Sequence, residues 1–280
     1  MHQGDRVCQM ASKNPHFDLA TIKVAVIDLD GVVYRGKTMI AGADAAISSL
    51  RQYGLQAVFA TNSSTRTRAD IAEKLKSMGI SAEEDEVLTS AYTAGLLIKS
   101  IGVSKNVLVI GAESLKEEIV HAGATVVAGP PCDLVIVGID TAFSYEKIRL
   151  AMEGIAGGAV FVACNRDACF PGDNGRMFPG CGPMVAAVEA AVGFPPHHIA
   201  GKPSVLMMEI IAARCHVRPD QILVIGDGME SDIQMAVAFG SPSVLVAPGI
   251  SKFNRGTTGP TCIIRSLAEL PALLEGKSPF

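Results

Sequence analysis

The chain has 280 residues, 49% of them hydrophobic and 19% charged, which suffices for one large or two medium domains with buried cores. Its net charge of −4 and pI near 5.9 argue against a nucleic-acid-binding protein, which has a basic surplus or a basic stripe. Apolar runs such as Leu134–Val137 are far shorter than the roughly 20 residues of a membrane helix, so no membrane-spanning segment is expected.

The N-terminus and the cysteines argue against two further classes of protein, secreted proteins and zinc-binding proteins. Residues 1–20 lack the apolar region of a secretory signal and are expected to form a loose N-terminal extension. The 7 cysteines are an odd number and have no Cys-x-x-Cys spacing. We therefore expect reduced thiols that are mostly buried, with no disulfide and no zinc cluster.

The first part of the chain alternates between strand and helix patterns. Ile22–Asp28 is a short apolar run that ends in an acid, which is typical of a buried parallel strand with a functional loop at its carboxyl end. A helical pattern over Ala43–Tyr53 and an apolar strand at Leu55–Ala60 follow. The segment Thr67–Asp70 has the spacing of a capping box, which predicts a helix that Gly79 ends.

The same alternation is present near the other end of the chain. Helices are expected at Ser204–Cys215 and Ser231–Phe239, and strands at Ile222–Ile225 and Ser243–Val246. A β-α-β-α order of this kind predicts a doubly wound parallel sheet. We expect both chain ends to contribute to that one sheet.

The middle of the chain has core-forming runs of its own. Strand and helix patterns alternate over Asn106–Ile110, Glu113–His121, Leu134–Val137, Tyr145–Gly154 and Val160–Ala163. The segment Gly172–Gly182 is rich in Gly and Pro and is expected to be a loop. The sequence therefore predicts an α/β protein with a Rossmann-like core from residues 1–89 and 197–280, and an inserted α/β domain at residues 90–196.

Acidic side chains follow the first predicted strand. Asp28 and Asp30 are two residues apart at the strand end, where α/β sheets bind ligands. A carboxylate there can attack phosphorus and form an aspartyl-phosphate. A second carboxyl group can protonate the leaving alkoxide and later deprotonate the attacking water. The pair is thus a hypothesis for phosphoryl chemistry, although an Asp-x-Asp-Gly turn taken alone is more often an ordinary loop.

Three further motifs have the chemistry that such a reaction needs. Thr61 and Asn62 offer a hydroxyl and backbone amides beside a helix start, which is typical of an anion site. Lys202 precedes another helix and can neutralise charge on a transferring phosphoryl group. The carboxylates of Gly226–Asp232 follow a strand and can hold Mg²⁺, which prefers few carboxylates, water and a substrate oxygen.

Taken together and in this order, the four motifs resemble the haloacid dehalogenase superfamily, and within it the NagD-like and p-nitrophenylphosphatase-like phosphatases that have a large α/β cap. The resemblance covers about residues 22–250. Further matching segments are Asp28–Gly36, Thr61–Ser64, Val137–Asp140 with Tyr145–Lys147, Asn165–Asp167 and the loop Gly180–Gly182.

The resemblance implies roles for the catalytic residues. Asp28 matches the nucleophile, and Asp30 matches the general acid/base and a magnesium ligand through its backbone carbonyl. Lys202 matches the residue that stabilises charge. In this superfamily phosphatases have an Asp two residues after the nucleophile, whereas dehalogenases and ion-pumping ATPases do not, so Asp30 favours hydrolysis of phosphomonoesters.

The resemblance also implies which residues bind the phosphate and the metal. Leu29, Thr61 and Asn62, together with the charge-stabilising lysine, are expected on the phosphate side. Asp28 and Asp227 are expected to ligate Mg²⁺ directly, and Asp232 through a metal-bound water or as an outer contact.

The expected protein is a cytoplasmic enzyme that hydrolyses a small-molecule phosphate ester, with a homodimer through the cap as a possible assembly. Two alternatives stay open: a phosphotransferase with the same intermediate, and a binding protein that has kept only the fold. Departures from the family pattern at Gly228, Ser231, Ala247–Gly249 and Gly180–Pro183 concern the substrate rather than the chemistry.

Four further residues have open roles. Arg166 and Asp167 are either substrate contacts or surface loop residues, and His197 and His198 either line a cleft or pack at a hinge.

Overall fold

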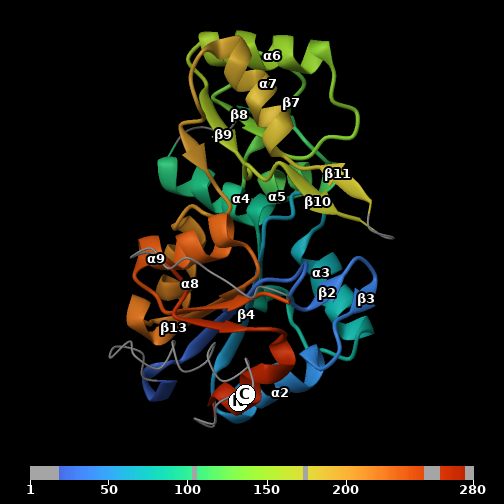
Figure 1. Ribbon diagram of the computed structural model, residues 1–280. Helices are drawn as coiled ribbons and strands as arrows, with labels where there is room; N and C mark the ends of the chain where they lie inside the picture. The colour runs from blue at the N-terminus through green and yellow to red at the C-terminus, as the bar shows by residue number, and fades with distance from the viewer. Residues whose placement is uncertain (1–18, 103–105, 173–175, 249–258, 275–280) are drawn as a thin grey trace. The chain divides into compact units, whose positions relative to one another are not determined.

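The computed structural model describes residues 19–102, 106–172, 176–248 and 259–274 (Figure 1). The predicted N-terminal extension, except for its last two residues, lies outside the described residues. The chain divides into two compact units. The first comprises Met1–Ala60, Lys74–Ala82 and Met208–Phe280, and the second comprises Thr61–Glu73 and Glu83–Met207. The finer boundaries at residues 90 and 196 stay a prediction.

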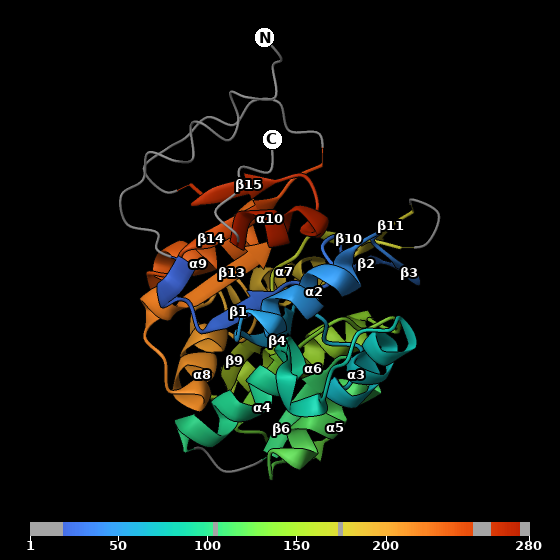
Figure 2. The ribbon, with the colours of Figure 1, turned by 90° about the horizontal axis from the view of Figure 1, so that it is seen from below.

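The first sheet has six strands in the order β15-β14-β13-β1-β4-β5. Its strands are β1 (Val24–Ile27), β4 (Gln56–Thr61), β5 (Val87–Thr89), β13 (Ile222–Gly226), β14 (Ser243–Val246) and β15 (Cys262–Ile264). Strand β1 pairs in parallel with both β13 and β4 and is buried along its whole length (Figure 2). Both ends of the chain therefore form this sheet, as predicted.

Helices cover both faces of the first sheet. Figures 1 and 2 show α8 (Leu206–Cys215) and α9 (Gln234–Phe239) on one face, and α2 (Ala43–Gln52) with α10 (Leu270–Leu274) on the other. Helix α2 buries one stripe of residues three or four apart, which is how an amphipathic helix packs on a sheet. That stripe is Ala43, Ala46, Ile47 and Leu50.

A short hairpin and a capped helix complete this part of the chain. Strands β2 (Tyr34–Arg35) and β3 (Thr38–Met39) pair antiparallel. Helix α3 (Arg68–Ser77) begins with the predicted capping box: Asp70 N–H donates to Thr67 Oγ1 over 3.1 Å, and Thr67 N–H donates to Asp70 Oδ2 over 3.0 Å. This confirms the predicted helix start.

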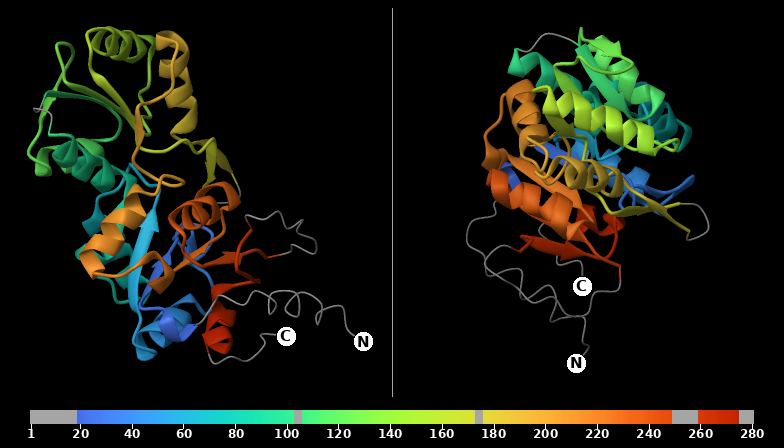
Figure 3. Two further views of the ribbon diagram at one scale, coloured as in Figure 1. Left: turned by 90° about the vertical axis from the view of Figure 1, so that its left-hand side faces the viewer. Right: turned by 90° about the horizontal axis from the view of Figure 1, so that it is seen from above.

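The second unit contains a parallel sheet of five strands in the order β12-β9-β8-β6-β7. Its strands are β6 (Asn106–Ile110), β7 (Thr125–Val127), β8 (Leu134–Val137), β9 (Val160–Ala163) and β12 (His198–Ile199). Helices α4 (Ser90–Ile101) and α5 (Glu113–His121) pack together on one face, and α6 (Tyr145–Ala156) and α7 (Gly182–Val192) on the other (Figures 1 and 3).

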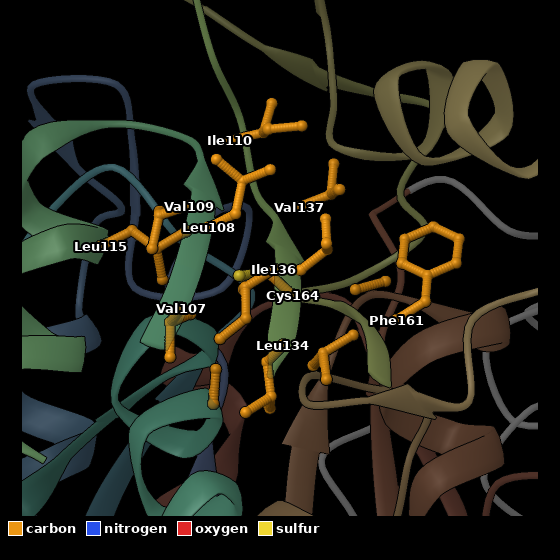
Figure 4. Packing of buried hydrophobic residues seen from close by; sticks show 14 of the residues in the cluster. Val107, Leu108, Val109, Ile110, Leu115, Leu134, Ile136, Val137, Phe161 and Cys164 are labelled. Atoms are coloured by element: carbon orange, nitrogen blue, oxygen red, sulfur yellow. The ribbon is translucent and has the colours of Figure 1, made fainter. Parts of the chain in front are cut away.

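The core of the second unit lies along its central strands. Strand β8 is buried at every residue, and Phe161 and Cys164 from β9 and the loop after it lie beside it (Figure 4). Helices cover both faces of such a sheet, so its strands are continuous apolar runs rather than alternating ones. This explains why their bounds could be predicted from the sequence.

One predicted loop is partly wrong. Within Gly172–Gly182 the chain forms strand β11 (Met177–Pro179), which pairs antiparallel with β10 (Cys169–Pro171). Phe170 and Phe178 are cross-strand partners and stack with ring centroids 5.8 Å apart, a pairing that stabilises a strand pair in spite of the neighbouring Gly and Pro. Helix α7 then begins at Gly182.

The helix predicted at Ser231–Phe239 begins earlier, with a π-helical turn over Met229–Ile233 that leads into α9. Across the part of the chain that the structure describes, every helix is too short or too polar to span a bilayer.

Candidate active site

Two aspartates lie at the same edge of the first sheet. Strand β1 ends at Ile27 and β13 at Gly226, and Ile27 lies opposite Ile225 in the parallel register. Asp28 and Asp227 follow these strands directly. Asp28 N–H donates to the carbonyl of Ile225 over 2.8 Å, which holds the first acid against β13. The carboxyl edge of a parallel sheet is where such folds bind ligands.

A third acid completes a cluster. Asp28, Asp227 and Asp232 each offer a carboxylate oxygen, and these oxygens all lie within 4.8 Å of one another. Asp28 and Asp232 are buried, whereas Asp227 is exposed. Three carboxylates at such distances repel one another, and a bound cation relieves that repulsion. The oxygen-only donor set suits a hard divalent cation.

Asp232 is held in place by the turn that carries it. Its Oδ2 accepts hydrogen bonds from Gly228 N–H over 3.1 Å and from the Ser231 hydroxyl over 3.2 Å. Its own N–H donates to the Gly228 carbonyl over 2.9 Å. The family resemblance predicts that Asp232 acts through a metal-bound water or as an outer contact. Its carboxylate lies close enough to those of Asp28 and Asp227 to take part in a metal site, and its exact role stays a prediction.

The chain directly after Asp28 turns sharply. Leu29 is fully buried, and its carbonyl accepts hydrogen bonds from Val33 N–H over 2.9 Å and Tyr34 N–H over 3.1 Å. A phosphate contact from Leu29 therefore has to come from its backbone N–H. Asp30 has an exposed side chain, which lies outside the three-carboxylate cluster. Exposure gives Asp30 access to water, as a general acid/base requires.

Gly31 permits the close approach of Asp227. Its φ is +91°, in the left-handed region, and a Cβ placed on it would lie 2.0 Å from Asp227 Oδ2. Any residue with a side chain would thus displace one of the three carboxylates. The Asp-x-Asp-Gly motif therefore needs its glycine for the cluster as well as for the turn.

The other predicted site residues belong to the second unit. Thr61 is the last residue of β4 and is 5% exposed, and its Oγ1 accepts a hydrogen bond from Ser63 N–H over 3.1 Å. Lys202 is 2% exposed. A buried lysine carries a large desolvation cost, which is a mark of a functional position.

Asn62 is bound to two segments that are distant in sequence. Its Nδ2 donates to the two carboxylate oxygens of Asp167 over 3.2 and 3.0 Å and to the Lys202 carbonyl over 3.1 Å. Its Oδ1 accepts from Lys202 N–H over 2.8 Å. The phosphate contact of Asn62 stays a prediction. The amide links Asp167 to the backbone of Lys202 through these hydrogen bonds.

Other residues with open roles have structural contacts. Arg166 forms an ion pair with Glu189 over 2.6 Å. His197 Nδ1 accepts a hydrogen bond from Phe161 N–H over 2.9 Å, and its ring packs edge-on against Phe194. His197 therefore has a packing role within the second unit. His198 lies exposed in β12.

The described cysteines are all free thiols. Cys164 and Cys181 are buried, and burial raises the pKa of both thiols, that of Cys181 to about 11. Thiols with such pKa values are protonated and unreactive at neutral pH. The prediction of buried thiols is confirmed for Cys164, Cys181 and Cys262, and Cys8 lies outside the described part of the chain.

Known proteins resemble this chain in sequence and in structure. The family described as Haloacid dehalogenase-like hydrolase matches residues 25–125, and a HAD-hydrolase-like family matches residues 199–270. The sugar-phosphatase AraL of Bacillus subtilis is 35% identical over 229 residues, which are 81% of this chain and 84% of that protein. An acid sugar phosphatase of Staphylococcus aureus is 30% identical over 256 residues, 90% of this chain and 98% of the relative.

Solved structures agree with the sequence relatives. A putative p-nitrophenyl phosphatase from Bacillus subtilis has a TM-score of 0.80 at 32% identity, covering 92% of this chain and 98% of its own. NagD from E. coli K-12 has a TM-score of 0.80 at 27% identity, covering 89% and 98%. The chain therefore belongs to the haloacid dehalogenase superfamily. Within that superfamily it is a phosphatase of the NagD-like and p-nitrophenylphosphatase-like group.

Proposed function

We propose that this phosphatase hydrolyses small phosphomonoesters with Mg²⁺, through an aspartyl-phosphate on Asp28. The observation that supports this most is the convergence of Asp28, Asp227 and Asp232 at the carboxyl edge of a parallel sheet. Two of the named sequence relatives are sugar phosphatases. Sugar phosphates are therefore the first substrate class that we propose.

The two acids after β1 would divide the reaction between them. Asp28 attacks the phosphorus atom, and the bond from phosphorus to the ester oxygen breaks. Asp30 gives that oxygen its proton, and in the second step it takes a proton from the water that releases phosphate from Asp28. A divalent cation on the three carboxylates would neutralise the charge that otherwise keeps an anionic ester from an anionic nucleophile.

The phosphate group would be bound by residues of the remaining motifs. Thr61 offers its hydroxyl, Leu29 its backbone N–H, and Lys202 an ammonium that stabilises negative charge on the transferring group. In this proposal Asn62 lies on the phosphate side of the site. Its hydrogen bonds with the Lys202 backbone support a second role, in which it positions that lysine.

The test is hydrolysis of p-nitrophenyl phosphate and of a panel of sugar phosphates, each with and without Mg²⁺. Asp28→Asn should abolish activity, and Asp44→Asn, an equal change of charge on an exposed helix position, should leave it intact. Mass spectrometry of the intact protein, trapped during reaction with a fast substrate, should show the gain of one phosphoryl group, which we assign to Asp28. Equal activity of Asp28→Asn and wild type would refute the nucleophile.

The alternative reaction uses the same intermediate. A phosphotransferase would pass the phosphoryl group to an alcohol rather than to water, so phosphorylated acceptor would accumulate when glycerol or a sugar is added. The relatives named as phosphatases favour water as the acceptor. They likewise favour an enzyme over a protein that has kept only the fold.

Assembly and location are part of the proposal. A homodimer through the inserted domain is consistent with the exposed side chains of Phe170, Met177 and Phe178 on the β10–β11 hairpin. Sedimentation velocity of the wild type would determine the oligomeric state, and a monomer at micromolar concentration would contradict the dimer. The cytoplasmic location stays a prediction.

A further inference from the structure

The side chain of Asn62 has a fixed orientation because its two ends meet opposite partners. Its oxygen accepts from Lys202 N–H, and its nitrogen donates to the Lys202 carbonyl and to Asp167. These three groups engage the amide's two N–H donors and one acceptor site of its oxygen. Asn62 thereby clamps the backbone of Lys202 on both sides of one residue.

The backbone of Asn62 is fixed as well. Its carbonyl accepts hydrogen bonds from Asn165 Nδ2 over 2.7 Å and from the Ser90 hydroxyl over 2.9 Å. Asn165 is 1% exposed and Ser90 is fully buried. Three segments far apart in sequence therefore meet at Asn62, and buried hydrogen bonds of this kind hold a rigid geometry.

The space around the clamp is tight. A Cβ placed on Gly201 would lie 2.4 Å from Asn62 Oδ1 and 2.6 Å from the carbonyl of Cys164. Gly201 also donates its N–H to that carbonyl over 2.7 Å. The backbone that leads into Lys202 therefore cannot shift without disturbing Asn62.

Asp167 favours the same orientation of the Asn62 amide as the two Lys202 backbone contacts do. A carboxylate only accepts hydrogen bonds, so it must face the NH₂ end of the amide. That choice directs Oδ1 toward Lys202 N–H. With the amide reversed, its oxygen would face the Asp167 carboxylate and its NH₂ would face Lys202 N–H, so both contacts would become repulsive. Asp167 is itself held by its N–H, which donates to Asn165 Oδ1 over 3.0 Å.

We propose that Asp167 is a positioning residue of the phosphatase, which orients the Asn62 amide and through it the backbone of Lys202. The proposal rests on the function proposed above, in which Lys202 stabilises charge in the transition state. A lysine whose stem is misplaced loses that stabilisation, and errors of about 1 Å cost up to roughly 10²-fold in rate. The effect therefore falls mainly on kcat and only slightly on binding of the ester.

Kinetics separate this role from a direct substrate contact. Asp167→Ala should lower kcat about tenfold, with little change in KM. The loss should be the same for p-nitrophenyl phosphate and for sugar phosphates. Asp167→Asn keeps an oxygen acceptor for Asn62 Nδ2 and should restore most of the rate. Glu153→Gln, at an exposed carboxylate of α6, should behave like wild type.

A double-mutant cycle adds a second kinetic criterion. Because Asp167 acts through Asn62, Asn62→Ala combined with Asp167→Ala should be no slower than Asn62→Ala alone. Additive losses, or losses that differ between leaving groups, would show that Asp167 contacts the substrate instead and would overturn the proposal.

Hydrogen exchange gives a readout that does not depend on activity. The Lys202 amide, followed by NMR, should exchange at least tenfold faster in Asp167→Ala and in Asn62→Ala than in wild type or Glu153→Gln. An unchanged rate in Asp167→Ala would overturn the proposal even if kcat fell. Absence of hydrolysis in the wild type would instead refute the proposed function, and the exchange data would still test the clamp.

Discussion

Gly31→Ala tests the link between the backbone after β1 and the metal site. Gly31 has a φ of +91°, where an L-residue is strained, and its added Cβ would lie 2.0 Å from Asp227 Oδ2 and 2.8 Å from the carboxyl carbon. Ordinary van der Waals contact begins near 3.4 Å, so the carboxylate must move by more than about 1 Å. The end of an Asp side chain can rotate away at little cost in stability.

The same displacement of the Asp227 carboxylate is incompatible with metal binding. Mg²⁺ holds its oxygens at about 2.0–2.1 Å in near-ideal octahedral geometry, so a carboxylate that moves by about 1 Å ceases to be a ligand. We expect the Mg²⁺ concentration for half-maximal hydrolysis of p-nitrophenyl phosphate to rise about 10–100-fold. The backbone strain should lower the free energy of unfolding by about 1 kcal/mol.

Gly54→Ala is the matched control. Gly54 has a φ of +81°, and a Cβ there would meet no atom within 4 Å. Both variants should thus lose similar stability in urea unfolding with a chelator present, and only Gly31→Ala should need more Mg²⁺. Equal metal requirements for the two variants would refute the reasoning that Asp227 holds the cation.

Two further predictions concern stability of the second unit. Glu118 is buried, and burial raises the pKa of its carboxyl above the usual 4.5 in spite of the nearby Arg68. The native state thus holds a proton that the unfolded state releases, and stability falls as pH rises from about 4.5 through the raised pKa. Glu118→Gln cannot ionise, so its free energy of unfolding in urea should rise relative to that of the wild type across that pH window. A difference that does not depend on pH would contradict this. Phe161→Ala should lower the free energy of unfolding by about 3–5 kcal/mol because it opens a cavity in the core of Figure 4, and Phe194→Ala, at a partly exposed site, should cost less than half as much. Equal losses would show that Phe161 does not pack as described.

Several elements could be predicted because their signals are local. Strands β6 and β8 have the predicted bounds, since a strand buried on both faces is a continuous apolar run. The start of α3 followed from Thr67 and Asp70, whose side chains cap each other within one turn. The pair Asp28 and Asp30 could likewise be recognised within the four consecutive residues Asp28–Gly31.

Other elements have weak local signals. Helix α4 is apolar nearly all round and buries most of its residues, so it has no polar face to set a helical period. The β10–β11 hairpin is stabilised by Phe170 stacking on Phe178, which the surrounding Gly and Pro conceal in the sequence. The family resemblance singles out Asn165 and Asp167, which follow β9, but no local pattern indicates their hydrogen bonds with Asn62.

The sequence by itself indicated the superfamily and the class of reaction, because each motif is a short run at the end of a strand, and it predicts Asp28 as the nucleophile. Tertiary structure decided the rest. It brought the carboxylate of Asp232 into the cluster with Asp28 and Asp227. It also joined Asn62 to Asp167 and Lys202, which are 105 and 140 residues further along the chain. The direction of a hydrogen bond over such a separation is set by the packing of the sheets, and no local pattern records it.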